Sequence, residues 1–429
     1  MDIFLIDDLP PETVAMLAAL YSRSPQSVQE HLKVVAERGA ESFMATYYVG
    51  YGHKSIGDCG TTSMFIEWVS LLAAKAIQDN PLYNGQEAST RYLDFGNTSL
   101  VNPCGPDGDL IQRTWMELYT GVLAALLPFF EMRFPREEGQ KKSVWRKAIK
   151  ARAFDVARGF LPAGVRTLVA WHSNLRQTAD HLKLMRHHPL KEVVEIADGL
   201  ERELLKRYPS SFGHKRYPEQ EAYLKSSMAE WAFSDRKACE FECHPMLIRA
   251  ELMEHALLLA SRPPKTELHQ RFRQYGDIIF KFMLDFGSYR DMQRQRSCVQ
   301  EMPLLTTRHG FHPWYLDQLP AVIRREVDQT IKKVVLCIEA LDASPEDKQY
   351  LTPIGFNCPV RITCSLPSAV YIAELRSGAT VHPTVRTVAQ QMGDALVDLV
   401  PSLAMHHDKS PGVWDIRRGE QDIVKKDEA

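Results

Sequence analysis

The sequence predicts an α+β protein made of two tandem, diverged repeats, residues 1–213 and 214–429, each a helix-rich module with a small antiparallel sheet. Two observations lead to this prediction. Segments with apolar residues at helical spacing fill most of the chain, and a set of short motifs recurs in the same order in both halves. The antiparallel sheets are implied by a family resemblance that the motifs carry and that is set out below.

Composition and charge exclude several classes of protein. The 429 residues are 45% hydrophobic and 25% charged, as in ordinary globular proteins, and the net charge of -2 gives no basis for binding a nucleic-acid polymer or a membrane surface. No apolar run is long enough to span a bilayer, and residues 1–8 do not resemble a secretion signal. We therefore expect a cytoplasmic protein with reduced thiols. We expect no metal site, because Cys239, Cys243 and His244 lack further ligands at suitable spacing.

The first half of the chain shows several helical patterns. Residues 11–40 have the apolar spacing of helices, with a break at Ser24 and Pro25. Residues 62–77 carry apolar side chains on nearly every face, so we expect a buried helix there. A loop rich in Pro and Gly at 97–109 precedes further expected helices at 110–133, 143–158 and 182–200.

After a linker at 208–213 the pattern begins again. Helices are expected at 222–260 and 320–341, and the run at 280–291 is similar to that at 62–77. Residues 351–355 are similar to 161–164. Because these correspondences keep their order along the chain, a duplication explains them better than chance.

The densest group of polar side chains lies at residues 84–92, after a long apolar run and a break that contains proline. Binding groups are often found in such loops. Arg91 beside Ser89 offers a fork for a phosphate, and Gln86 and Glu87 can pair with the edge of a base or sugar. On composition alone, a polar turn without a ligand is the more frequent explanation.

Residues 87–92 read Glu-Ala-Ser-Thr-Arg-Tyr, which resembles the Glu-x-Ser-x-Arg-Tyr end of the signature of the flavin-dependent thymidylate synthases. His53 and Ser55 are similar to the His-x-Ser segment of that family. The family's Arg-His-Arg is missing before residue 84. It appears in the second half as Arg294-Gln295-Arg296, with Gln in place of His.

Three more segments resemble this family. Residues 157–162 match its Ala-Arg-x-x-Leu-Pro, in which the Arg contacts the nucleotide, here Arg158. Asn174 and Arg186 match a block whose Asn supports the flavin and whose later Arg meets the nucleotide. Arg376 corresponds to Arg186 in the second half.

The resemblance implies a fold, cofactors and a reaction. These are FAD as cofactor, NADPH as hydride source, and methyl transfer from methylenetetrahydrofolate to C5 of a uridine nucleotide, dUMP or a relative. In this family hydride from the reduced flavin activates the uracil ring, so no protein nucleophile is required. The family's active sites lie between subunits, which implies a homo-oligomer of tandem chains.

Because each half keeps a different part of the signature, the sequence predicts a composite site to which both repeats contribute. The residues expected in catalysis are Arg186, Arg294 and Arg296. Those expected to hold the flavin are His53, Ser55, Glu87, Asn174, Arg294, Gln295 and Arg296. Those expected to bind the nucleotide are Gln86, Glu87, Ser89, Arg91, Tyr92, Arg158, Arg186 and Arg376.

Two alternatives stay open at this point. Gln295 cannot titrate as the family's His does, and Asp291 stands where a Gln that helps to hold the pyrimidine would fall. These departures allow a diverged protein that binds FAD or a nucleotide without turnover. The second alternative is a helical scaffold whose arginines contact a partner.

Overall fold

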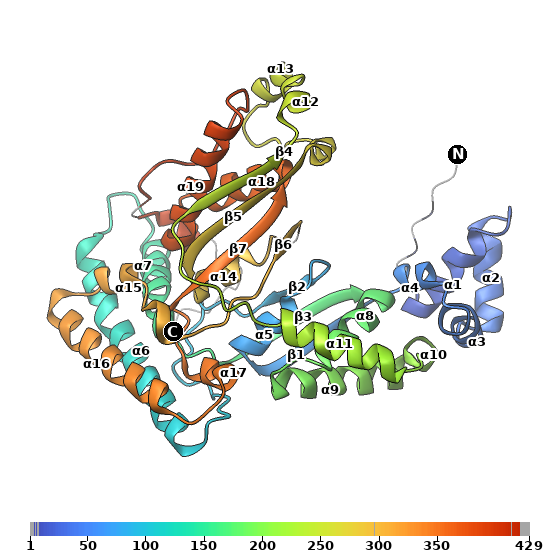
Figure 1. Cartoon of the computed structure of the whole chain (residues 1–429), viewed down its shortest axis with the longest axis horizontal. Coiled ribbons are helices and arrows are strands. Elements are labelled where there is room, and N and C mark those ends of the chain that lie inside the picture. Colours follow the sequence, from blue (N-terminus) through green and yellow to red (C-terminus); the bar gives the residue numbers. More distant parts are fainter. Residues whose placement is uncertain (1–3, 5, 7, 296, 413, 421–429) are drawn as a thin grey trace. The chain divides into compact units, whose positions relative to one another are not determined.

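The computed structural model describes residues 4, 6, 8–295, 297–412 and 414–420. Helices and small antiparallel sheets make it an α+β protein, as the sequence predicts (Figure 1). The chain forms two compact units. Unit 1 contains residues 1–69, 76–87 and 168–232, and unit 2 contains 70–75, 88–167 and 233–429. Unit 2 therefore combines segments from both halves of the chain.

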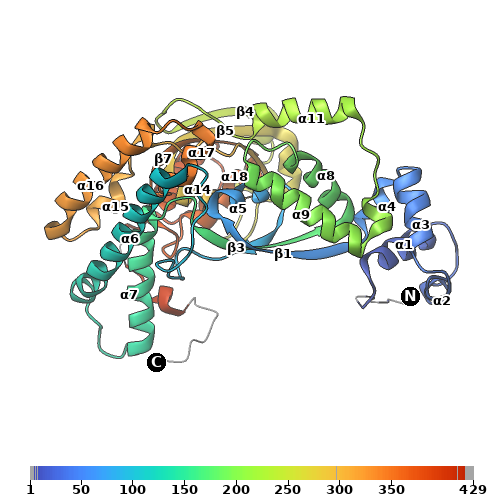
Figure 2. The same ribbon diagram turned by 90° about the horizontal axis from the view of Figure 1, so that it is seen from below.

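Unit 1 contains most of a three-stranded sheet in the order β1-β3-β2, in which β2 pairs antiparallel with β3. Figure 2 shows α8 and α9 on the same side of the ribbon formed by β1 and β3, and Trp171 is buried while His172 is exposed. The strands are β1 (Thr61–Ser70), β2 (Asn84–Glu87) and β3 (Arg166–Asn174). The helices are α1 (Pro11–Tyr21), α2 (Val28–Arg38), α3 (Glu41–Phe43), η1 (Met44–Gly50), α4 (Lys54–Asp58), α8 (Leu175–Met185), α9 (Lys191–Arg207), α10 (Pro209–Phe212) and α11 (Pro218–Trp231).

The single buried helix expected at residues 62–77 is wrong. The segment forms strand β1 and then helix α5 (Leu71–Gln78). Met64 and Ile66 are buried whereas Phe65 is exposed, which is the two-residue alternation of a half-buried strand. The exposed side of β1 is itself apolar in places, so the alternation was hidden in the composition.

Unit 2 contains a four-stranded antiparallel sheet in the order β4-β5-β7-β6. The strands are β4 (Glu242–Leu247), β5 (Gly276–Asp285), β6 (Cys298–Gln300) and β7 (Asn357–Ser365). The continuous helix expected at 222–260 is therefore wrong, because α11 ends at Trp231 and β4 follows. Pro245 lies within β4, and an edge strand tolerates its missing N–H better than a helix interior would.

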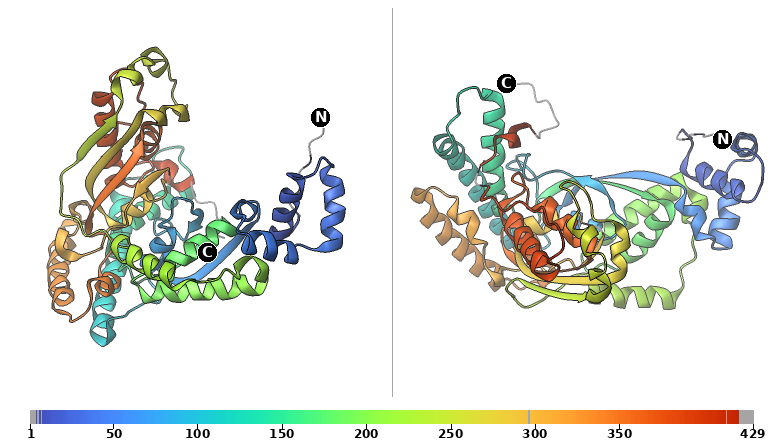
Figure 3. Two further views of the ribbon diagram at one scale, coloured as in Figure 1. Left: turned by 45° about the vertical axis from the view of Figure 1, so that its right-hand side comes forward. Right: turned by 90° about the horizontal axis from the view of Figure 1, so that it is seen from above.

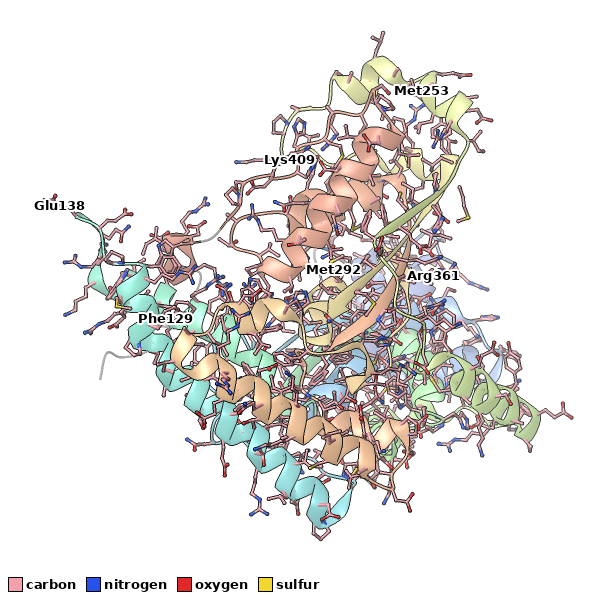
Figure 4. The ribbon with its side chains drawn as sticks, turned by 60° about the vertical axis from the view of Figure 1, so that its left-hand side comes forward. Phe129, Glu138, Met253, Met292, Arg361 and Lys409 are labelled. Carbon is pink, nitrogen blue, oxygen red and sulfur yellow. The ribbon has the colours of Figure 1, made fainter. Side chains whose placement is uncertain are left out.

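The remaining helices of unit 2 include the long helices that the sequence predicts. Figure 3 shows α16 alongside α6, and Met292 at the end of α14 is fully buried (Figure 4). The longer helices are α6 (Gly105–Arg133), α7 (Lys142–Ala157), α14 (Phe286–Met292), α16 (Ala321–Ala340), α18 (Leu366–Arg376) and α19 (Pro383–Leu399). The short ones are η2 (Arg158–Phe160), α12 (Arg249–Met253), α13 (Ala256–Ala260), η3 (Gln270–Tyr275), η4 (Thr307–His309), α15 (Pro313–Asp317), α17 (Pro345–Lys348), η5 (Gln349–Leu351) and η6 (Ile416–Glu420).

The two halves share one order of elements. The series β1, α5, β2, α6, α7, η2, β3, α8, α9 recurs as β5, α14, β6, α16, α17, η5, β7, α18, α19, with the short η4 and α15 added in the second half. The strand orders β1-β3-β2 and β5-β7-β6 also agree. The backbone bond from Leu71 N to Val165 O corresponds to that from Phe286 N to Phe356 O. The chain is therefore a tandem repeat at the level of its backbone.

Within unit 2 the backbones of the two repeats meet in a short reciprocal ladder. Gly164 N donates to Tyr350 O at 2.9 Å, and Gly355 N donates to Gly159 O at 2.9 Å. The two segments that resemble each other in sequence thus lie side by side. A Cβ atom at residue 355 would stand 2.5 Å from Gly159 O, so this approach requires glycine. Among the described residues, no helix combines the length and apolar character needed to cross a membrane.

We expect Gly355→Ala to lower the free energy of unfolding by about 1–3 kcal/mol, because the added methyl must push the two backbones apart. Urea denaturation followed by circular dichroism measures this change. Gly378→Ala is the matched control, since the nearest atom to its added Cβ lies 3.6 Å away. Equal stability of the two variants would contradict the close approach.

Candidate functional site

Arg91 and Asp155 form a buried ion pair in unit 2. Arg91 lies in the turn after β2, and Asp155 lies near the end of α7. Arg91 Nε donates to Asp155 Oδ1 at 2.6 Å and Nη2 donates to Oδ2 at 3.0 Å, a two-pronged contact. Nη2 also donates to the backbone oxygen of Thr380 at 3.3 Å. The guanidinium predicted to hold a phosphate is therefore fixed in place.

Arg418 is a second cation on the same carboxylate, and it comes from the C-terminal segment. Its Nη2 lies 3.1 Å from Asp155 Oδ1, its guanidinium lies over the Tyr92 ring at 4.7 Å, and its Nη1 donates to the Tyr92 hydroxyl. Burial alone would raise the pKa of Asp155, but Arg418 and Arg91 more than offset it and hold that pKa far below its usual range. Asp155 is therefore ionised at neutral pH.

Asp291 at the end of α14 is the second carboxylate of the site. Arg158 Nη1 lies 3.6 Å from its Oδ2. Burial alone would raise the pKa of Asp291. The charge of Arg158, followed by those of Arg91, Arg294 and Arg376, lowers it well below its usual range. Cations of both repeats therefore converge on one carboxylate.

Arg158 belongs to a buried polar network. Its side chain is 2% exposed, and its Nη2 donates to Ser288 Oγ at 2.9 Å. Thr384 Oγ1 lies 2.7 Å from Ser288 Oγ and donates to Asp285 Oδ1 at 2.7 Å. Tyr315 OH donates to the other oxygen of Asp285 at 2.7 Å. The network fixes Arg158 against the second repeat.

His382 joins this network to Asp155. Its Nε2 lies 3.1 Å from the backbone oxygen of Asp155, so Nε2 carries the proton, and its Nδ1 lies 2.9 Å from Thr384 Oγ1. Burial, followed by the charge of Arg158, lowers the pKa of His382 to about 3. His382 is therefore neutral at physiological pH.

The residues after α14 stand where the Arg-His-Arg motif was predicted. Arg294 is exposed and Gln295 is buried. With its amide oriented to satisfy both groups, the Gln295 oxygen accepts from Arg376 Nε at 3.0 Å and from Nη2 at 2.7 Å. Gln295 thus orients Arg376, a contact that needs no titratable group. Arg296 lies outside the described residues.

Several other predicted site residues belong to unit 1. His53 and Ser55 are exposed at the start of α4, and Gln86 is exposed on β2. Glu87 is buried and accepts from Gln78 at 3.0 Å. Asn174 caps α8 by accepting from Gln177 N at 2.8 Å.

Arg186 also belongs to unit 1. It follows α8 and lies 3.4 Å from both Glu201 and Glu221. The equivalent helices α8 and α18 have the same length, and they end at Met185 and Arg376. By position along these helices Arg376 therefore corresponds to Met185, and not to Arg186 as the sequence comparison had it.

Of the predicted residues that the structure describes, seven lie in unit 2 and six in unit 1. Those in unit 2 are Ser89, Arg91, Tyr92, Arg158, Arg294, Gln295 and Arg376. We call the following set the Arg91 cluster: Arg91, Arg158, Arg294, Arg376, Arg418, Asp155 and Asp291. Of the predicted residues, Gln295 binds one of its members, and Ser89 Oγ accepts from Arg91 N at 3.3 Å.

Positive charge exceeds negative charge in the Arg91 cluster. Five guanidinium groups stand against two carboxylates among the described residues, and counting Asp285 as well leaves an excess of two positive charges, since 5 − 2 − 1 = 2. A partly buried excess of this kind is costly unless a ligand supplies the missing negative charge. The arrangement is suited to an anionic ligand.

Sequence reasoning missed Asp155, Arg418 and His382. Asp155 stands in a basic helix, and nothing in its neighbourhood marks it as a partner of Arg91. Two residues of the C-terminal segment could have indicated that it packs on the protein. Trp414 stacks on Phe134 with ring centres 4.6 Å apart, and Gly419 packs against the backbone of α7.

We expect Asp155→Asn to lower the free energy of unfolding by about 3–5 kcal/mol at pH 7, because two buried guanidinium groups lose their shared counter-charge. This difference in stability is fully present above the ordinary carboxyl pKa of 3.8. It becomes smaller below that pH, because the stabilisation that ionised Asp155 gives the folded wild type decreases as the pH falls. Urea denaturation measures the difference. Asp342→Asn, at an exposed position, is the control and should stay within about 0.5 kcal/mol of wild type.

A second expectation concerns His382. The unfolded chain protonates this side chain below its ordinary pKa of 6.5, whereas the folded chain does so only near 3, so it weakens folding as pH falls through this window. From pH 7 to pH 5 the contribution is about 2 kcal/mol. We expect His382→Gln to remove this part of the pH dependence of unfolding and the exposed His172→Gln to keep it. An unchanged pH dependence in His382→Gln would contradict a buried neutral imidazole.

No group of three or more His, Cys, Asp and Glu side chains in the described part of the chain is arranged to hold a metal ion.

Comparison with known proteins shows which family and which relatives the chain is similar to. Residues 4–210 match the family model described as thymidylate synthase complementing protein. A UPF0159 protein of Chlamydia muridarum is 24% identical over 432 aligned residues, which cover 85% of this chain and 80% of the relative. A UPF0159 protein of Chlamydia pneumoniae is 22% identical over 93% of this chain and 90% of the relative, and one of Thermoplasma acidophilum is 22% identical over 86% and 88%. Residues 4–210, just under half of the chain, are therefore similar to the thymidylate synthase complementing protein family.

Proposed function

We propose that this protein is a flavin-dependent enzyme that transfers a methyl group from methylenetetrahydrofolate to C5 of a uridine nucleotide, dUMP or a relative. FAD would be its cofactor and NADPH its hydride source. The reaction would take place at the Arg91 cluster. The match of residues 4–210 to this family supports the reaction class, and the composition of the cluster supports the site.

The observation that carries the proposal is the excess of positive charge in the Arg91 cluster. A phosphate monoester carries about −1.5 to −2 charges at pH 7, which matches an excess of two. Arginine presents a planar fork that pairs with phosphate oxygens in two-pronged contacts. A nucleotide would therefore neutralise the cluster while gaining charge-assisted hydrogen bonds.

The residues of the cluster fit a flavin as well as a nucleotide. Arg294 is exposed directly after α14, and Arg376 is held by Gln295 beside it. Both cations can face an anionic ring or a diphosphate, and neither guanidinium loses its proton at physiological pH. We infer that Arg294, Gln295 and Arg376 would hold the flavin end of the site. Arg296, His53, Ser55, Glu87 and Asn174 remain predicted flavin contacts.

The nucleotide end would be formed by the turn after β2. Arg91 is partly accessible, with 14% of its side chain exposed, and it is held by Asp155. Ser89 precedes it and Tyr92 follows, held by Arg418. Arg158 is 2% exposed and pairs with Asp291, so we assign it the role of positioning Asp291 rather than direct contact. Gln86, Glu87 and Arg186 remain predicted nucleotide contacts.

A bound reduced flavin would supply hydride to the uracil ring, so the protein would need no nucleophile of its own. The protein's part would be to fix both ligands and to offset their negative charge. Preorganised donors of this kind are an effective means of lowering an activation barrier.

The two repeats differ at the positions proposed to bind the flavin and to hold Asp291. Counting along α5 and α14 from their first residues, Asp79 and Asn80 correspond to Arg294 and Gln295, and Gln349 at the start of η5 corresponds to Arg158 at the start of η2. An acidic side chain thus replaces a cation in the first repeat. We infer one flavin site in each chain.

We expect Arg294→Ala to lose flavin and Arg91→Ala to lose dUMP while it keeps flavin. Losing one charge-assisted contact costs about 1.5–3 kcal/mol, or about 10- to 150-fold in Kd. The visible absorption spectrum of the purified protein measures flavin, expected at one per chain, and calorimetric titration measures dUMP.

Arg324→Ala is the matched control for these variants, because this arginine is exposed on α16 and pairs with Asp317 outside the Arg91 cluster. It should keep both ligands. If Arg294→Ala and Arg91→Ala also kept both, the proposed site would be wrong.

Turnover is tested separately from binding. Formation of dTMP from dUMP with methylenetetrahydrofolate and NADPH supports the enzyme. Binding of both ligands without dTMP or deuteride transfer to dUMP supports instead a diverged binding protein. The replacement of a titratable His by Gln295 is the observation that keeps this second candidate in place.

A further inference from the structure

Unit 1 contains a pocket whose lining residues all lie outside the Arg91 cluster. It is formed by one face of α8, by Glu201 of α9, by residues 212–217 between α10 and α11, and by the first turns of α11. It encloses about 500 Å³, within the range of small-molecule sites. We call it the Arg186 pocket, after its most buried cation.

Positive charge exceeds negative charge among the side chains that line the Arg186 pocket. The cations are Lys54, Lys183, Arg186, Lys215 and Arg216, and the anions are Glu201 and Glu221. Lys183 pairs at 3.0 Å with Asp180, which lies outside the lining, so the excess is two positive charges, 5 − 2 − 1 = 2. Among the described residues, no carboxylate lies within ion-pair distance of Lys54 or Lys215.

Arg186 is held in the wall of the pocket but is not saturated. Its side chain is 9% exposed, and its two terminal nitrogens lie 3.4 Å from Glu201 and Glu221. A charge-assisted hydrogen bond is usually 2.7–2.9 Å long, so both contacts are weak. Its Nε has no hydrogen-bond partner among the described residues. Both glutamates also contact a second cationic or titratable side chain, Arg216 for Glu201 and His187 for Glu221.

The pKa of His214, which lines the pocket, is lowered in part by the positive charges around it. Burial lowers its pKa first, and the charges of Lys183 and Lys54 lower it further, against a smaller opposing effect of Asp180. The charges of both lysines therefore act on His214.

The lining also includes apolar side chains. Phe212 is 7% exposed, and Leu182 is buried. Tyr217 is 53% exposed and adds an aromatic ring to the lining. Apolar and aromatic lining side chains favour a ring or hydrocarbon portion of a ligand, whereas the cationic side chains favour a doubly charged anion.

We propose that the Arg186 pocket binds a small phosphate monoester that carries a ring, with the phosphate on Arg186, Lys54 and Lys215 and the ring against Phe212 and Tyr217. The excess of two positive charges matches a phosphate monoester better than a single carboxylate. The pocket lies wholly within unit 1 and is separate in its residues from the Arg91 cluster.

Calorimetric titration with adenosine monophosphate tests the proposal, with adenosine and citrate as comparison ligands. We expect adenosine monophosphate to bind, inorganic phosphate to compete with it, and adenosine to bind at least tenfold more weakly. Binding of citrate as tight as that of adenosine monophosphate would overturn the phosphate assignment.

Substitutions locate the binding. Arg186→Met and Lys215→Met should each weaken binding of adenosine monophosphate about tenfold or more. Lys225→Met, on the exposed surface of α11 outside the pocket, should leave it unchanged. Lys215 is exposed and has no ion-pair partner in the described part of the chain, so this variant tests the pocket even if Arg186→Met fails to fold. Unchanged binding in Lys215→Met would overturn the proposal.

Failure of this proposal can be distinguished from failure of the proposed enzymatic function, because different variants test them. Arg91→Ala should keep adenosine monophosphate at this pocket, and Arg186→Met should keep the flavin spectrum. If Arg186→Met instead lost dUMP and kept adenosine monophosphate, the pocket would be excluded and Arg186 would return to the nucleotide site.

Discussion

The structure of unit 2 depends on one buried carboxylate that is shared by two guanidinium groups. Asp155 on α7 binds Arg91 from the turn after β2 and Arg418 from the C-terminal segment. These residues are far apart along the chain, so the pair ties three segments to one point. A charge that is buried with its partners stabilises only if all of them stay in place. The same contact therefore fixes the fold locally and holds the Arg91 guanidinium in one orientation.

The tandem repeat explains why one chain can carry such a cluster. Both copies keep the same strands, the same strand order and the same backbone bonds to the segment before β3 or β7. Their side chains have diverged, since Asp79 stands where the second copy has Arg294. Backbone hydrogen bonds constrain a fold strongly whereas exposed side chains do not. The architecture was therefore kept in both repeats while their charged residues diverged.

Two regions of the molecule show the same electrostatic pattern, an excess of two positive charges around a held arginine. In the Arg91 cluster the arginine is bound at 2.6 Å by a carboxylate of its own unit. In the Arg186 pocket the contacts are 3.4 Å long and one nitrogen has no partner among the described residues. The first arrangement is preorganised, whereas the second leaves more of the hydrogen-bonding capacity of the guanidinium unused. The difference lies in geometry and not in composition.

The sequence by itself determined the long helices α6, α7 and α16 and the order of the repeated motifs, because helical periodicity and local motifs depend on neighbours along the chain. The antiparallel sheets of the α+β class followed from the family resemblance and not from periodicity. The sequence also pointed to Arg91, Arg294 and Arg376. It could not reveal β1, whose exposed face is partly apolar, nor the link between Asp155 and Arg418, which lie far apart in sequence. Tertiary structure alone decided which cations share a carboxylate and which line the pocket of unit 1. Charge pairing depends on distance in space, and a linear pattern does not carry that distance.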